Sequence, residues 1–162
     1  MKVKTVIIPA AGFGTRFLPW VKEVPKEMLP LVNKPIIQHV VEECLSAGLE
    51  NIVIVVREGN NIVENYFKKP TPEVYDLLLS VGKESRFREV SEVLSYKEVK
   101  IVKQRTDLPY GNGSPVLSAM SEVPQGEPFA VCFADDLVLS EKSGIGQLLE
   151  YFEYNEIDGV IG

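Results

Sequence analysis

Short apolar runs alternate along the chain with segments whose apolar positions recur every three or four residues. Continuous apolar runs of this length are typical of strands buried on both faces of a parallel sheet. Strands are therefore predicted at 6–8, 51–56, 99–102, 129–133 and 159–161.

The segments between these runs carry helical patterns. Helices are predicted over 35–48, 60–67, 72–94, 111–120 and 145–152, and the third should break near Gly82. Gly48 follows its apolar stripe at the position of a helix C-cap. Strands that alternate with helices predict an α/β fold with a doubly wound, mostly parallel, Rossmann-like sheet. Ligands of such sheets bind beyond the carboxyl ends of the strands.

Composition narrows the class of protein. A chain of 162 residues suits one domain. Its net charge is −6 and it has no block of basic residues, which argues against nucleic acid or a membrane surface as a partner. Cys44 and Cys132 lie in apolar segments without metal-ligand spacing, so buried, reduced thiols are expected. No apolar run approaches membrane-spanning length, and we expect a cytoplasmic protein.

The first predicted strand opens into a glycine-rich turn, Pro9 to Arg16, which reads PAAGFGTR. Backbone N–H groups in such a turn are not shielded by Cβ atoms and can surround an anion. Arg16 ends the turn and Lys26 follows further on, and both add positive charge suited to phosphate oxygens. The residues alone predict a loop that handles phosphate.

Two common glycine motifs do not fit this turn. The dinucleotide fingerprint needs a third small residue where the chain has Phe17, and an acidic residue about 20 positions on, at the end of the next strand. The second predicted strand ends near Val56, which is too late. A Walker loop needs Ser or Thr after Gly-Lys, whereas Gly82-Lys83 continues with Glu84.

The stretch from Val6 to Pro30, VIIPAAGFGTRFLPWVKEVPKEMLP, resembles the signature of the sugar-phosphate nucleotidyltransferases, G-x-G-T-R followed by P-K. The segment PKEMLPLVNKPIIQHVVEE, Pro25 to Glu43, is similar in particular to bacterial and archaeal UTP–glucose-1-phosphate uridylyltransferases. The resemblance implies a nucleotide-diphospho-sugar transferase fold, with residues 1–162 as a single nucleotide-binding and catalytic portion. It covers about the first half of a typical member. We therefore expect the sugar-binding C-terminal half to be absent and the fold to be incomplete at that end.

The resemblance also implies three catalytic residues. Arg16 would engage the leaving pyrophosphate, to which a forked donor is suited. Lys26 would bridge the sugar phosphate and the α-phosphate. Asp135 would hold Mg2+, the expected cofactor; a carboxylate at the end of a strand is a hard oxygen ligand of the kind that this ion takes.

The remaining implied contacts surround the nucleotide and the sugar. Gln104 would read uracil, because a side-chain amide both donates and accepts. Ala11 and Gly12 would offer backbone groups to the base with Glu27 nearby, and Asp136 would face the sugar. The set of expected binding residues is completed by Gly14, Thr15 and Gly111.

The chain departs from the family pattern after Gln104. Relatives usually read R-Q, a short spacer and then G-L-G-H-A. Here Lys103-Gln104 is followed by a longer spacer and then Gly111-Asn112-Gly113-Ser114-Pro115, with Ser114 at the position of the usual histidine. Pro115 suits the first turn of the following helix. This changed loop leaves the choice of base open.

The sequence therefore predicts a Mg2+-dependent nucleotidyltransferase that makes UDP-glucose and pyrophosphate from UTP and glucose 1-phosphate. Two alternatives stay open. One is the same chemistry on another pair, such as dTTP with a hexose phosphate. The other is a regulatory module that binds a nucleotide or nucleotide sugar without turnover. The expected partners are a nucleoside triphosphate and a sugar 1-phosphate, with neither nucleic acid nor membrane, and the sequence leaves room for a homo-oligomer.

Overall fold

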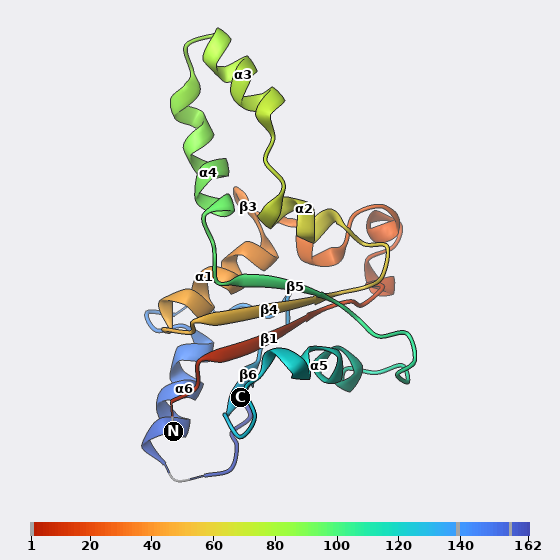
Figure 1. Cartoon of the computed structure of the whole chain (residues 1–162), viewed down its shortest axis with the longest axis vertical. Coiled ribbons are helices and arrows are strands. Elements are labelled where there is room, and N and C mark those ends of the chain that lie inside the picture. Colours follow the sequence, from red (N-terminus) through yellow and green to blue (C-terminus); the bar gives the residue numbers. More distant parts are fainter. Residues whose placement is uncertain (1, 139, 156) are drawn as a thin grey trace.

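A four-stranded parallel sheet forms the centre of the protein (Figure 1), in a computed structural model that describes residues 2–138, 140–155 and 157–162. The spatial order of its strands is β5 (Val99–Lys103), β4 (Asn51–Val56), β1 (Thr5–Ala10), β6 (Phe129–Val131). Ile7 on β1 is in register with Val53 on β4 and with Val131 on β6. The parallel sheet predicted from the apolar runs is confirmed.

Helices cover both faces of this sheet. One face packs against α1 (Ile36–Ser46), α2 (Ile62–Lys68), α4 (Arg88–Leu94) and α6 (Gly144–Tyr154). The other face packs against α5 (Gly113–Ala119). Because successive strand residues point to opposite faces, Val6 and Ile8 enter the first cluster and Ile7 the second. The doubly wound arrangement is also as predicted.

Glycines with positive φ end two of the predicted helical segments. Gly48 has a φ of 83° directly after α1, and the next amide, that of Leu49, donates back to the Cys44 carbonyl at 3.2 Å. Gly82 has a φ of 65° in the turn after α3 (Pro72–Ser80). A short 3-10 helix, η4 (Glu84–Phe87), then leads into α4. Together they form a helical hairpin that projects from the sheet (Figure 1), so the break expected near Gly82 is confirmed.

The segment between β1 and α1 has local structure that the apolar pattern did not indicate. It contains the 3-10 helices η1 (Thr15–Phe17), η2 (Trp20–Lys22) and η3 (Lys26–Met28), followed by a two-stranded antiparallel pair, β2 (Pro30–Leu31) and β3 (Lys34–Pro35). Another 3-10 helix, η5 (Met120–Glu122), follows α5. Lys34 fixes the end of the segment, because its Nζ donates to Glu42 of α1 at 2.8 Å.

The prediction of a strand at 159–161 is wrong. The described residues 157–162 contain no strand, and the sheet ends with β5 on one side and β6 on the other. Backbone groups form a strand only where a neighbouring strand pairs with them, and these residues have no such neighbour. In the part of the chain that the structure covers, no helix is long and apolar enough to cross a membrane.

Candidate active site

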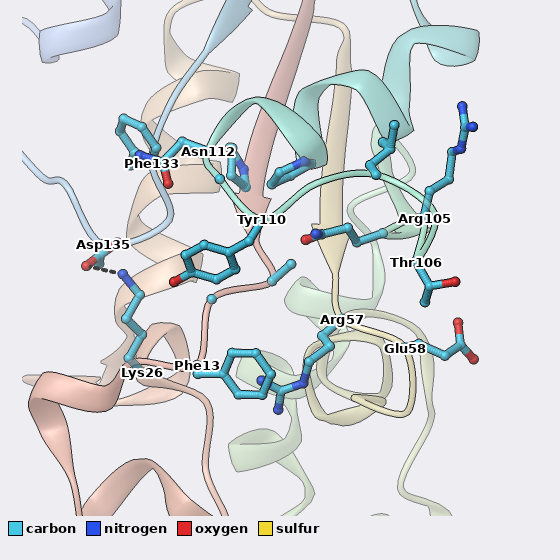
Figure 2. Close-up of a pocket in the computed structure, with 17 residues that line it drawn as sticks. Phe13, Lys26, Arg57, Glu58, Arg105, Thr106, Tyr110, Asn112, Phe133 and Asp135 are labelled. Atoms are coloured by element: carbon cyan, nitrogen blue, oxygen red, sulfur yellow. Dashed lines mark hydrogen bonds and ion pairs between the residues drawn. The ribbon is translucent and has the colours of Figure 1, made fainter.

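All four strands deliver residues to one cavity of about 360 Å³ at their carboxyl ends (Figure 2). Gly12 reaches it from the loop after β1, Arg57 from the end of β4, Gln104 from the end of β5, and Asp135 from the loop after β6. Its volume lies within the range of small-molecule sites, roughly 300–1,000 Å³. The cavity is at the edge of the sheet where topology predicted a ligand.

Lys26 and Asp135 form an ion pair at this cavity. The Lys26 Nζ donates to Oδ2 of Asp135 at 2.7 Å (Figure 2), and the two side chains are 21% and 28% exposed. Lys26 begins η3, whose turn is closed by the Met28 amide donating to the Pro25 carbonyl at 2.9 Å. This partly buried pair concentrates both signs of charge where polar ligand groups can reach them.

Two glycines of the loop after β1 have different structural roles. Gly14 has a φ of 61°, and a Cβ placed on it would lie 3.3 Å from the Lys26 Cβ. Its lack of a side chain therefore allows the lysine segment to pack closely against the loop. Gly12 lines the cavity, and a Cβ placed on it would meet nothing within 4 Å. Space beside Gly12 is thus left for a ligand to approach the backbone.

Glu27 is fully buried beside Lys26, and neither of its carboxylate oxygens has a hydrogen-bond partner among the residues that the structure describes. Burial raises its pKa to about 7, against the opposing effects of its own backbone amide and of the Lys26 charge. The negative charge of Asp135 acts in the same direction as burial. Glu27 does not line the cavity, so the structure gives it no direct route to a ligand.

The structure brings together some of the predicted site residues and leaves others outside. The cavity is lined by Ala11, Gly12, Lys26, Gln104, Gly111 and Asp135. The residues outside its lining are Gly14, Thr15, Arg16, Glu27 and Asp136. Arg16 is exposed in η1, and Asp136 is exposed in the turn after β6. The individual roles of all these residues stay predictions.

Several cavity residues were not identified from the sequence. Phe13, Tyr110 and Phe133 contribute aromatic rings, and Arg57 contributes a guanidinium group. The central carbon of that group, Cζ, lies 4.2 Å from the centre of the Phe13 ring. An arginine directly after a predicted parallel strand, at the same edge as Gln104, was the available signal.

The loop that departs from the family pattern is tied to α5. The Arg105 amide donates to Ser118 Oγ at 3.0 Å, and that hydroxyl donates to the Ser114 carbonyl at 2.7 Å. Ser114 is buried, and its hydroxyl donates to the Pro109 carbonyl. The residue at the position of the usual histidine therefore closes the loop and does not line the cavity.

The donor set of the cavity limits how a metal ion could be held. Over the described ranges, no three or more His, Cys, Asp or Glu side chains are grouped so that they could bind an ion. Asp135 offers the carboxylate beside Lys26, whereas Glu58 lines the other end of the cavity. Most oxygens around a cation at Asp135 would therefore have to come from a ligand and from water. Such sparse protein coordination suits Mg2+, which keeps several waters and often binds through substrate phosphates.

A doubly wound sheet with a glycine loop and a lysine–aspartate pair at its carboxyl edge makes the chain an α/β protein with a ligand cavity at the position usual for this fold. The chain belongs to the nucleotidyl transferase family, whose family model matches residues 5–158.

Relatives and solved structures agree with this assignment. Over 161 residues the chain is 39% identical to a UTP–glucose-1-phosphate uridylyltransferase of Bacillus subtilis, covering 99% of this chain and 53% of the relative. A UDP-glucose pyrophosphorylase from Acinetobacter baumannii superposes with a TM-score of 0.82 at 31% identity, covering 95% of this chain and 54% of that one. A UDP-glucose pyrophosphorylase complexed with UDP-glucose has a TM-score of 0.72 at 33% identity, with coverages of 93% and 53%. The chain spans about half the length of the curated relatives it matches.

Proposed function

We propose that the protein transfers UMP from UTP to glucose 1-phosphate, giving UDP-glucose and pyrophosphate. The similar proteins named for this reaction support the proposal. The observation that carries it is the Lys26–Asp135 pair, 2.7 Å apart, in one cavity with Gly12 and Gln104. Those groups correspond to what the reaction needs, which is a cation for phosphates, a hard ligand for a metal, and contacts for a base.

The reaction joins two anions in line. A phosphate oxygen of glucose 1-phosphate forms a bond to the α-phosphorus of UTP, and the bond from that phosphorus to the bridging oxygen of the β-phosphate breaks. Pyrophosphate leaves with the electron pair. Lys26 stabilises the charge on the α-phosphate and reduces repulsion between the reactants. We assign the leaving pyrophosphate to Arg16, in the 3-10 helix that follows the glycine loop.

Asp135 would bind a divalent cation, Mg2+ in this proposal, together with phosphate oxygens of the nucleotide. The cation, when bound, supplies positive charge that offsets the charge of the triphosphate. Asp135 would then no longer hold the Lys26 ammonium group, which becomes available to the α-phosphate. One ion pair thus prepares two ligand contacts.

The base would lie at the ends of β1 and β5. Gln104 can donate to and accept from the edge of uracil, and its own amide is fixed by donating to the Val56 carbonyl at 2.8 Å. The backbone of Ala11 and Gly12 lines the same cavity. Asp136 would face the sugar.

The test is pyrophosphate release from UTP and glucose 1-phosphate, with Mg2+ or with EDTA, and with dTTP, CTP, ATP and GTP in parallel. Lys26→Ala and Asp135→Asn should each lower the rate by about a hundredfold or more, the usual effect of removing one transition-state contact. Lys22→Ala is the matched control, because this exposed lysine lies in the same segment but outside the cavity. It should keep the full rate.

Three results would count against the proposal. Full activity in Lys26→Ala or Asp135→Asn would contradict the catalytic assignment. UTP binding without any pyrophosphate release would indicate a binding module without turnover. A melting temperature that UTP with Mg2+ fails to raise at any concentration would contradict a nucleotide site altogether.

A further inference from the structure

The charged residues around the cavity differ in whether they are neutralised. Lys26 pairs with Asp135, and the Arg105 Nε donates to Oδ1 of Asp107 at 3.0 Å. Arg57 also lines the cavity, and among the residues that the structure describes it makes no ion pair with a carboxylate. Its positive charge is therefore available to a ligand.

Arg57 is held in place by packing. It directly follows β4, the strand between β1 and β5, and its Cζ lies 4.2 Å from the centre of the Phe13 ring. Phe13 belongs to the glycine loop and is 59% exposed. A guanidinium group over an aromatic face is attracted by the ring, and its N–H groups remain at its edge for other partners. The contact thus orients the donors of Arg57 before any ligand arrives.

The position of Arg57 indicates which part of a nucleotide it would meet. Figure 2 shows Lys26 and Asp135 at one end of the cavity and Arg57, Glu58 and Thr106 at the other, with Phe13 between Lys26 and Arg57. In the proposed function the phosphates occupy the end with Lys26. The base then extends toward the end that Arg57 shares with the strand that delivers Gln104.

We propose that Arg57 determines base specificity by donating N–H groups to the carbonyl oxygen at C4 of uracil, the position at which cytosine carries its amino group. Arginine has donors and no acceptor, so it pairs with a carbonyl and leaves an amino group unpaired. A donor that the bound ligand shields from water and leaves without a partner weakens binding. The site therefore favours uracil over cytosine, which carries an amino group in place of one carbonyl. This inference rests on the proposed function and adds a residue to its specificity.

The experiment measures dissociation constants for UTP and CTP, which share ribose and triphosphate and differ only in the base. Inorganic tripolyphosphate serves as a third probe. The unaltered chain should bind UTP about tenfold or more tightly than CTP, the range expected for a good arginine–base contact. Arg57→Met keeps an aliphatic chain against Phe13, and Arg57→Ala removes the side chain. Both should weaken UTP by about the same factor, leave CTP nearly unchanged, and bring the ratio close to one.

Two further variants separate charge from geometry. Arg57→Lys keeps the charge but lacks the planar fork, so it should restore little of the preference. Arg86→Ala removes the same charge from the projecting hairpin, where the arginine is exposed, and should leave the ratio unchanged. Circular dichroism of each variant verifies that it is folded.

The outcomes distinguish the inference from the function on which it rests. Equal weakening of UTP, CTP and tripolyphosphate would show a phosphate contact and overturn base recognition. An unchanged UTP/CTP ratio in folded Arg57 variants would leave Arg57 as a packing residue and overturn this inference alone. If the unaltered chain binds no nucleotide, the inference and the proposed function both fail.

Discussion

Lys26 and Asp135 are 109 residues apart in the sequence, yet the Nζ of one lies 2.7 Å from Oδ2 of the other. The lysine comes from the segment after β1, and the aspartate follows β6, the strand next to β1. Since parallel neighbours end at the same edge of a sheet, strand order alone brings these segments together. The ion pair is the link between the first loop and the last strand.

This pairing predicts a reversal in UTP affinity for Asp135→Asn. Without a divalent cation, the substitution removes a negative charge from the cavity and releases Lys26, so UTP should bind about three- to tenfold more tightly than to the unaltered chain. With Mg2+ present the variant lacks the metal ligand, and it should bind UTP more weakly. Isothermal titration calorimetry in EDTA and in Mg2+ measures both affinities. Asp76→Asn, on the exposed α3, should change neither, and an Asp135→Asn variant that is weaker in both buffers would contradict the expectation.

Glu27 makes stability depend on pH. Its pKa is about 7 in the folded chain and 4.5 in the unfolded reference, so between these values the folded state holds a proton that the unfolded state has lost. The contribution of Glu27 to the stability of the fold is therefore greatest below about pH 4.5. It falls as pH rises toward 7 and is constant above that, with a total loss of roughly 3 kcal/mol.

Glu27→Gln removes this titration. We compare the free energy of unfolding of the variant with that of the unaltered chain at each pH. This difference should be more favourable to the variant at pH 8 than at pH 4.5, by up to about 3 kcal/mol. Urea unfolding at the two pH values measures the difference. Glu84→Gln, at an exposed position in η4, should show no such dependence. If the free energy of unfolding changes equally with pH in Glu27→Gln and in the unaltered chain, burial does not raise the pKa of the Glu27 carboxyl.

Three glycine substitutions separate backbone strain from ligand access. Gly14→Ala and Gly48→Ala both place a side chain at positive φ, 61° and 83°, and each should lose about 1–2 kcal/mol of stability. Only Gly14→Ala also crowds Lys26, so only this variant of the two should weaken UTP binding. The Cβ that Gly12→Ala adds has no atom within 4 Å. This variant should keep its stability but bind UTP more weakly, because the methyl group enters the cavity.

Urea unfolding and UTP titration on the same three proteins provide the measurements. If Gly48→Ala weakens UTP as much as Gly14→Ala does, the loss would follow from general destabilisation. Normal UTP affinity in Gly12→Ala would place the ligand away from that part of the loop.

Ser118 is expected to hold the loop beside Gln104. Ser118→Ala removes the acceptor of the Arg105 amide and the donor to the Ser114 carbonyl, and should cost about 1–2 kcal/mol of stability. The amide of Arg105 should exchange its hydrogen faster, and UTP affinity should fall several-fold. Hydrogen exchange followed by mass spectrometry measures the first effect. Ser121→Ala, exposed in η5, is the control, and unchanged exchange in Ser118→Ala would show that the loop is fixed by other contacts.

Strong apolar patterns account for the part of the fold that could be predicted. The run at 51–56 matches β4, and its residues from Ile52 to Val56 are completely buried. Because both faces of the strand are buried, every position is apolar and the strand can be predicted from the sequence. The run at 159–161 looks similar in sequence but forms no strand, because pairing depends on a neighbour that local sequence does not show. The 3-10 helices and the β2–β3 pair depend on local hydrogen bonds, which leave no apolar period.

The site was predictable as far as strand ends determine it. A ligand was expected beyond the carboxyl ends of the strands. Lys26, Gln104 and Asp135 lie on segments that leave this edge of the sheet, and all three line the cavity. The Arg57–Phe13 contact could not be predicted, since it depends on the directions of two side chains from separate loops. The pyrophosphate contact of Arg16 and the sugar contact of Asp136 were implied by the resemblance, and both residues lie outside the cavity lining.

The projecting hairpin provides a site at which a label can be attached to the protein. None of the residues of α3 is buried, and the turn at Gly82 is exposed. The outer half of the hairpin therefore contributes no side chain to the hydrophobic core between the sheet and its helices. Exposed turns of this kind tolerate inserted sequence. A fluorophore or immobilisation tag placed at Gly82 would therefore report on the protein while leaving the strands and their ligand cavity as they are.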